Sequence, residues 1–245
     1  ATVERVVDGD TLDVRTAGGA VHELPGFDDG MWWIQDASSA MPARLLGDVR
    51  GKTVTDLCAA PGGKTLQLAA MGAQVIALDR SAQRLKKLEQ NLQRMRLQQH
   101  VEIIAADAGE WRPKEPPQFI LLDAPCTATG TARRHPDVLH LKSPRDLASL
   151  VDVQARILAN AFDILAPGGT LVYCVCSLQK AEGEAQIERL FAAREDAIKR
   201  PIKAEEIGGM EEPLTEYGDA RILPYHLAAL GGMDGFYISR MTKTA

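Results

Sequence analysis

Short apolar runs alternate with amphipathic stretches along most of this chain. Five runs rich in β-branched and other apolar residues predict buried strands, at 53–58, 74–79, 101–107, 118–125 and 170–177. Between the second and third runs, four apolar residues from 85 to 95 recur at helical spacing, and a longer helix is predicted from Pro144 to just before Pro167. A final strand is expected at 235–241.

Strands that alternate with helices predict an α/β fold, here a Rossmann-like, doubly wound and mostly parallel sheet. Residues 1–50 differ, because Gly/Asp turns such as Asp8-Gly9-Asp10 and Gly18-Gly19 separate short alternating stretches. We therefore expect a small β-rich N-terminal appendage at 1–50 and one main domain at 51–245. Sheets of this class bind ligands beyond the carboxyl ends of their strands, so the residues that end each strand are the candidates for function.

Composition narrows the class of protein. With 245 residues, 45% hydrophobic and 25% charged, the chain is an ordinary globular protein, which excludes disordered and collagen-like classes. Four cysteines do not make a disulfide scaffold, so a reducing, cytoplasmic compartment is expected, and neither a signal peptide nor a membrane segment is recognised. A net charge of −5 gives no global signal for nucleic acid, although residues 80–99 hold six Lys/Arg against one Glu.

The first predicted strand runs into Cys-Ala-Ala-Pro-Gly-Gly-Lys-Thr at 58–65. Paired glycines allow a tight turn and close approach of a ligand, and the following helix N-terminus favours an anionic group. A phosphate-binding P-loop requires glycine where this chain has Cys58, and the Gly-x-Gly-x-x-Gly fingerprint is also missing. The segment therefore predicts a nucleotide-like loop that is neither of these motifs.

Acidic residues end the next three strands, at Asp79, Asp107 and Asp123. An acid in the position of Asp79 commonly holds the ribose hydroxyls of an adenosine ligand. A single such acid is often only a helix cap. Three in series beside a glycine-rich loop predict a nucleoside pocket.

The cysteines add candidate nucleophiles. Cys58 follows the first strand, Cys126 follows the fourth and Cys176 ends the fifth, so all three thiols are expected on one rim of the sheet. Burial as small core side chains fits Cys58 and Cys174 well, but fits Cys126 less well because its loop is polar. No two cysteines have the spacing of a zinc site, so no metal is expected. Downstream of Cys126, the Arg133-Arg134 pair either binds phosphate or lies in a solvated loop.

Four ordered segments carry a resemblance to a known family: DLCAAPGGKT at 56–65, LLDAPCTATGTARRHPD at 121–137, LVYCVCSLQKAEGE at 171–184 and GGMDGFYISRM at 231–241. Together they resemble the Sun/Fmu-type RNA cytosine-5 methyltransferases, most closely those that act on bacterial 16S ribosomal RNA. The likeness covers about residues 21–245. It implies a methyltransferase domain at 51–245, S-adenosylmethionine as methyl donor and RNA as partner, with transfer RNA as the alternative, and we expect a monomer.

Matching positions carry the family's roles. Cys176 would be the nucleophile that attacks cytosine, Cys126 would assist product release, and Asp123 would contact both cofactor and target base. Asp79 would hold the ribose and Asp107 the adenine side of the cofactor. The cofactor's methionine part would lie on Cys58, Ala59, Ala60, Pro61, Gly62, Gly63 and Lys64. RNA would contact Arg133, Arg134 and His135.

The chain departs from the family pattern in a few places. Thr127 stands where Ser is expected, Val175 replaces Thr before the nucleophile, and Cys174 replaces a small residue. Relatives also carry an N-terminal RNA-binding domain, of which residues 1–50 would be an incomplete part. Three alternatives stay open from the sequence: Cys126 as the nucleophile, a nucleotide hydrolase that uses Lys64 and Asp123, and a non-catalytic scaffold in ribosome assembly.

Overall fold

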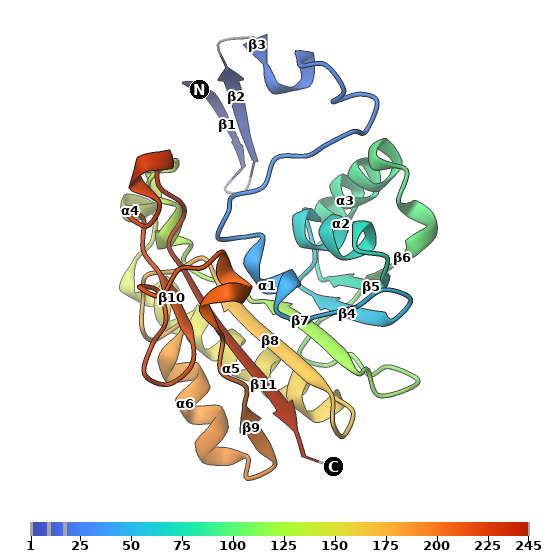
Figure 1. Cartoon of the computed structure of the whole chain (residues 1–245), viewed down its shortest axis with the longest axis vertical. Helices are drawn as coiled ribbons and strands as arrows, with labels where there is room; N and C mark the ends of the chain where they lie inside the picture. Colours follow the sequence, from blue (N-terminus) through green and yellow to red (C-terminus); the bar gives the residue numbers. More distant parts are fainter. Residues whose placement is uncertain (1, 9–10, 17–18, 245) are drawn as a thin grey trace.

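A central sheet organises the computed structural model, which describes residues 2–8, 11–16 and 19–244. Within these residues the sheet has eight strands in the order β10-β11-β8-β7-β4-β5-β6, with β9 also paired to β11 (Figure 1). The strands are β4 (Thr53–Leu57), β5 (Gln74–Asp79), β6 (Val101–Ala105), β7 (Phe119–Asp123), β8 (Thr170–Val175), β9 (Ala197–Lys199), β10 (Ala220–Ile222) and β11 (Phe236–Lys243). Strands β4 to β8 are parallel, whereas β11 runs antiparallel to β8, β9 and β10.

Helices cover both faces of this sheet (Figure 1). One apolar cluster packs α1 (Met41–Arg44), α2 (Gly63–Ala70) and α3 (Ala82–Met95) against one face. A second cluster packs α5 (Pro144–Ile164) and α6 (Glu184–Ala193) against the other. The short α4 (Val138–Leu141) lies in the segment between β7 and α5. The sheet is therefore doubly wound, as the alternation of strands and helices predicted.

Local sequence explains where the two long helices begin. Ser81 caps α3 by accepting a hydrogen bond from the amide of Arg84 at 3.3 Å. Ser143 and Asp146 form a reciprocal capping box at the start of α5, with Pro144 at the first helical position. These caps fix the helix starts independently of the core.

The N-terminal part forms a separate three-stranded antiparallel sheet, β1 (Thr2–Asp8), β2 (Thr11–Thr16) and β3 (Gly19–Ala20), at one end of the molecule (Figure 1). The predicted turns at Asp8-Gly9-Asp10 and Gly18-Gly19 fall on residues 9–10 and 17–18, which lie outside the described residues. Further along, Met41, Leu45 and Val49 are buried in the main core, although they belong to the 1–50 range assigned to the appendage.

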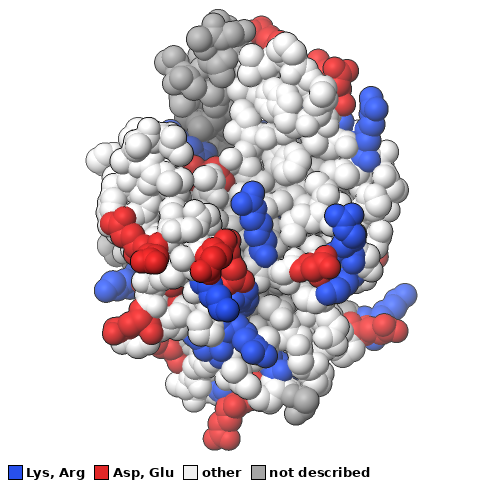
Figure 2. Space-filling model, in the orientation of Figure 1, with Lys and Arg blue, Asp and Glu red and all other residues white. Residues whose placement is uncertain are grey.

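The structure confirms the predicted fold class, and the six strands predicted in the main domain match observed ones to within two residues at each end. Strands β9 and β10 were missed because three residues are too short to show a period. No helix in the described part of the chain is long and apolar enough to cross a membrane. On the face shown in Figure 2, acidic and basic side chains lie next to one another.

Candidate active site

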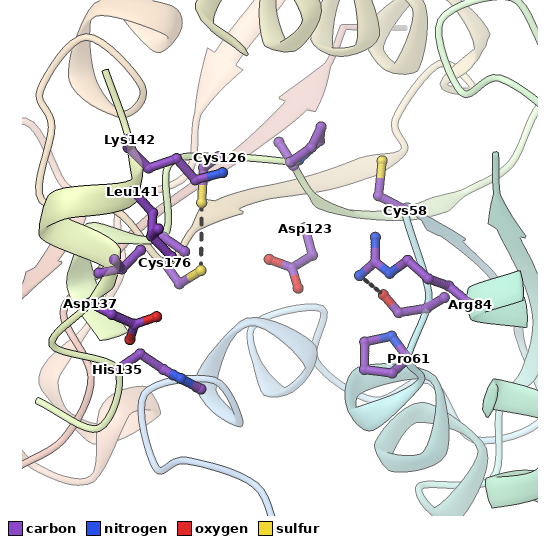
Figure 3. Close-up of a pocket in the computed structure, with 15 residues that line it drawn as sticks. Cys58, Pro61, Arg84, Asp123, Cys126, His135, Asp137, Leu141, Lys142 and Cys176 are labelled. Atoms are coloured by element: carbon purple, nitrogen blue, oxygen red, sulfur yellow. Dashed lines mark hydrogen bonds between the residues drawn. The ribbon is translucent and has the colours of Figure 1, made fainter. Parts of the chain in front are cut away.

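A cavity of about 390 Å³ opens at the carboxyl ends of β4, β7 and β8 (Figure 3). Its lining comes from the loop after β4, the first turn of α3, the loop after β7, α4 with the residues on either side of it, and the residue that follows β8. The lining residues used below are Cys58, Ala60, Pro61, Arg84, Asp123, Cys126, His135, Asp137, Lys142 and Cys176. The cavity therefore lies where parallel α/β sheets bind their ligands.

The loop 58–64 forms one wall of this cavity. Cys58 has φ 64° and Gly62 has φ 114°. The positive φ at residue 62 favours glycine there, and the chain turns at this residue directly into α2. The Ala59 amide donates to Leu78 O at 2.9 Å, and Asn91 Nδ2 donates to Pro61 O at 3.2 Å. These bonds hold the loop against β5 and α3, while the first amides of α2 have no partner inside the helix. Such an end suits the carboxylate of an amino-acid-like ligand.

The predicted ribose-binding residue lies directly behind this loop. Asp79 is 3% exposed, and its carboxylate accepts hydrogen bonds from the amides of Ala60 at 3.2 Å and Ser81 at 2.8 Å. Arg84 approaches the same carboxylate at 3.7 Å, donates to Ala60 O and lines the cavity. Asp79 thus shapes the loop from behind and does not itself line the cavity.

Asp107 lies away from the cavity lining. Both of its oxygens bind the guanidinium of Arg156, at 3.0 and 2.9 Å, and one also accepts from the Gly109 amide at 2.7 Å. The bond from Arg156 holds the pKa of Asp107 below its usual range.

Asp123 ends β7 and faces the cavity beside a buried cation. Lys64 Nζ lies 2.7 Å from Asp123 Oδ2 and 3.0 Å from Ser39 Oγ, with the lysine only 7% exposed. Burial alone would lower the pKa of Lys64, but the charge and hydrogen bond of Asp123 together with the nearby Cys174 and Cys176 outweigh burial, and the pKa is raised. The glycine-loop lysine is therefore committed to the carboxylate of Asp123. This pairing was not foreseen, because the two residues are 59 positions apart.

The structure brings two of the predicted thiols into contact. Cys126 Sγ and Cys176 Sγ lie 3.5 Å apart at the cavity wall, facing Asp123 (Figure 3). Burial raises the pKa of Cys58, and burial together with Asp123 raises that of Cys174. The hydrogen bond with Cys176, burial and nearby negative charge raise the pKa of Cys126. These three thiols are therefore kept protonated.

The two arginines expected to contact RNA form ion pairs within the protein. Arg134 Nε donates to Asp234 Oδ2 at 2.7 Å, and Arg133 lies 3.1 Å from Asp36 Oδ2 and 3.6 Å from Asp234 Oδ1. His135 is 4% exposed but lines the cavity.

Three further charged residues line the cavity without having been predicted, namely Arg84, Asp137 and Lys142. A role for Arg84 could have been suspected from the sequence, because it lies in the first turn of the helix that follows the strand ending in Asp79. Within the described residues, no three His, Cys, Asp or Glu side chains gather as a metal site.

Known proteins match this chain over most of its length. The profile of the family described as 16S rRNA methyltransferase RsmB/F matches residues 43–242. A probable ribosomal RNA small subunit methyltransferase B from Synechocystis sp. is 38% identical over 231 residues, 92% of this chain and 50% of the relative. The ribosomal RNA small subunit methyltransferase B of Erwinia tasmaniensis is 40% identical over 240 residues, 96% of this chain and 52% of the relative. The chain therefore spans about half the length of these curated relatives.

Solved structures show the same fold. NSun6 from Pyrococcus horikoshii, solved with SFG, superposes with a TM-score of 0.74 at 27% identity, covering 92% of this chain and 56% of that one. A methyltransferase homologue from the same organism gives a TM-score of 0.73 at 30% identity, covering 91% and 72%. The expected family, fold and S-adenosylmethionine dependence are thereby confirmed at the level of the family. This chain belongs to the RsmB/F family of 16S rRNA methyltransferases.

Proposed function

We propose that this protein transfers a methyl group from S-adenosylmethionine to carbon 5 of a cytosine in 16S ribosomal RNA, through a covalent bond between Cys176 and the base. The observation that carries the proposal is the convergence of Cys176, Cys126 and the Lys64-paired Asp123 on one cavity, beside the loop 58–64. The relatives' names support ribosomal RNA as the substrate class.

The chemistry requires a nucleophile of this kind. Carbon 5 of cytosine is too weak a nucleophile to take a methyl group directly. When a thiolate adds to carbon 6, carbons 4 and 5 become an enamine and carbon 5 gains electron density. Cys176 fits this role because it lines the cavity with Asp123 and lies 3.5 Å from the second thiol, Cys126.

Two neighbours of Cys176 would assist. Asp123 lines the cavity, so its carboxylate can accept a hydrogen bond from the amino group of the cytosine, and in protonated form it would donate one to the ring nitrogen N3. Cys126, 3.5 Å from Cys176, would assist product release, in which a base takes the proton from carbon 5 and the Cys176 thiolate leaves. Positioning of base and methyl donor in this cavity supplies much of the remaining rate enhancement.

The cofactor's place is proposed from the residues that fit it. The α2 N-terminus and loop 58–64 would hold its amino-acid part, Asp79 its ribose and Asp107 its adenine side. S-adenosylmethionine, when bound, supplies an activated methyl group. Calorimetric titration tests this placement, with micromolar binding of S-adenosylmethionine and none of ATP expected. Binding of ATP alone would favour the nucleotide-hydrolase alternative.

A covalent adduct with RNA tests the role of each thiol. The chain is incubated with 16S ribosomal RNA and S-adenosylmethionine and analysed by denaturing electrophoresis. Cys176→Ser is expected to abolish the adduct, whereas Cys126→Ala is expected to accumulate it because release stalls. Asp152→Asn, an exposed change on α5, serves as the control and retains transient adduct formation. An adduct with Cys176→Ser would instead make Cys126 the nucleophile, and methylation at a position other than carbon 5 would overturn the proposal.

A further inference from the structure

A fully buried carboxylate stands behind the two cavity thiols. Glu182, in the turn before α6, is 0% exposed. Its Oε1 accepts hydrogen bonds from the Thr127 amide at 2.9 Å and from Gln154 Nε2 at 3.0 Å. Its Oε2 accepts from Thr127 Oγ1 and Ser177 Oγ, each at 2.5 Å. One side chain therefore receives four hydrogen bonds.

These bonds join the two segments that carry the thiols. Thr127 follows Cys126, and Ser177 follows Cys176, so the carboxylate holds the chain immediately after each thiol. Further links join the two loops near this point: Thr127 Oγ1 and Thr129 Oγ1 each lie 3.2 Å from Ser177 Oγ, the Leu178 amide donates to Thr129 Oγ1 at 3.0 Å, and the Gly130 amide donates to Cys176 O at 3.0 Å. Glu182 is the carboxylate that hydrogen-bonds to both loops at the point where the two sulfurs lie 3.5 Å apart.

Hydrogen bonds hold both the backbone and the side chain of Glu182 in place. The buried Tyr173 hydroxyl donates to Glu182 O at 2.6 Å. Gln154, which binds the carboxylate, also donates to Pro125 O at 2.8 Å, one residue before Cys126. The network thus reaches the Cys126 loop on both sides of the thiol.

The donor set explains why this residue is a carboxylate. All four donors are neutral, and no ion pair involves Glu182 among the described residues. Two carboxylate oxygens accept four hydrogen bonds, whereas a glutamine offers a single acceptor oxygen and would turn an NH₂ donor toward other donors. The negative charge also lies close enough to contribute to the raised pKa of Cys126.

We propose that Glu182 is a positioning residue that fixes Cys126 and Cys176 relative to each other for methyl transfer. This inference rests on the proposed function, in which both thiols act on the target cytosine. Glu182 touches neither the cavity nor any reacting atom, and it acts through the loops that it joins.

Two variants distinguish the effect of the length of the Glu182 side chain from the effect of its charge. Glu182→Asp keeps the charge but shortens the side chain, so that it no longer spans both loops. Glu182→Gln keeps the length but loses the charge and one acceptor. Both are expected to lower kcat about 10²-fold, as expected when reacting groups are misplaced by about 1 Å. The KM and Kd for S-adenosylmethionine stay within two-fold, because loop 58–64 does not contact Glu182. Glu188→Gln, an exposed charge change on α6, is the matched control.

A second measurement needs neither RNA nor cofactor. Alkylation of Cys126 by iodoacetamide is followed against pH by mass spectrometry, at a temperature where circular dichroism shows each variant folded. Glu182→Gln removes a nearby negative charge, so the midpoint is expected to move to lower pH, whereas Glu182→Asp and Glu188→Gln leave it in place.

The outcomes distinguish this inference from the proposed function. If both Glu182 variants keep kcat within two-fold of the unchanged protein while folded, the positioning role is wrong. If the unchanged protein does not methylate cytosine, the proposed function fails. The alkylation midpoint then still decides whether Glu182 acts on the Cys126 thiol, and an unmoved midpoint with Glu182→Gln would overturn that as well.

Discussion

Asp56 shows how strongly burial changes a single carboxyl group in this protein. It lies on β4, is 1% exposed, and accepts a hydrogen bond from Thr65 Oγ1 at 2.6 Å, while its Oδ1 has no hydrogen-bond partner. Burial raises its pKa to about 7, although the bond from Thr65 opposes the shift. Lys64 and Asp123, by contrast, form an ion pair in which each charge compensates the other.

This raised pKa predicts a pH-dependent stability. Between pH 4 and 7 the folded protein keeps the Asp56 proton that the unfolded chain loses, so stability falls as pH rises through this window, by about 4 kcal/mol for a shift of about three units. Asp56→Asn should remove that fall and be more stable than the unchanged protein above pH 7. Urea unfolding at pH 4.5, 6 and 7.5 measures this, with the exposed Asp152→Asn as control. An equal pH dependence of stability in the unchanged protein and in Asp56→Asn would contradict this prediction.

At the scale of elements, close backbone contact joins the loop after β7 to the ends of β8 and β11. The Gly130 amide donates to Cys176 O at 3.0 Å, and the Gly235 amide donates to Gly130 O at 2.8 Å. A Cβ added at Gly130 would lie 2.0 Å from Gly235 O and 3.0 Å from Cys176 O. Only glycine allows these three segments to meet.

Gly130→Ala is therefore expected to push the Cys126 and Cys176 loops apart. We expect a loss of about 1–3 kcal/mol in the free energy of unfolding from overpacking, together with a reduced kcat. Gly208→Ala is the control, because its φ of 79° disfavours a side chain but nothing lies within 4 Å of the added Cβ. Denaturant unfolding and methyl-transfer rates are measured for both. A smaller loss for Gly130→Ala than for Gly208→Ala would show that the loops accommodate the methyl group.

At the scale of the whole molecule, an ion cluster ties three distant segments together. Asp36 Oδ1 accepts from the Asp234 amide at 3.1 Å, Arg133 pairs with Asp36, and Arg134 pairs with the buried Asp234. Burial raises the pKa of Asp234 even though Arg134 opposes the shift. The chain before α1 is thereby anchored to the segment before β11.

The two arginines are predicted to differ in their effect on stability. Arg134→Ala leaves the Asp234 carboxylate buried without its 2.7 Å partner and should cost about 1–3 kcal/mol, a range reduced because Arg134 is partly exposed. Arg133→Ala should cost less than about 1 kcal/mol. Urea unfolding of both variants measures the difference. If the two variants lose the same free energy of unfolding, the burial of Asp234 does not determine the stability of the ion cluster. Filter binding to RNA against salt then measures whether either arginine also contacts phosphate.

Much of the fold followed from local pattern. Apolar runs identified β4 to β8 and the last strand, because burial on both faces of a parallel sheet requires continuous apolar runs, and the stretch between Pro144 and Pro167 identified α5. The site followed from position, since residues that end parallel strands meet at one edge. Cys58, Asp123, Cys126 and Cys176 indeed line one cavity. Asp107 lies outside this lining, with its carboxylate bound to Arg156, and its role toward the cofactor stays a prediction.

The sequence by itself determined the order of elements, the family and the candidate chemistry, because periodicity, capping residues and motifs are local properties of the chain. Tertiary structure alone decided which side chains meet. Lys64 and Asp123 are 59 positions apart, and Glu182 joins loops that follow Cys126 and Cys176. Such partners depend on how strands 50 or more residues apart align in the sheet. Protonation at Asp56 and the thiols depends on the burial and neighbours that only this packing creates.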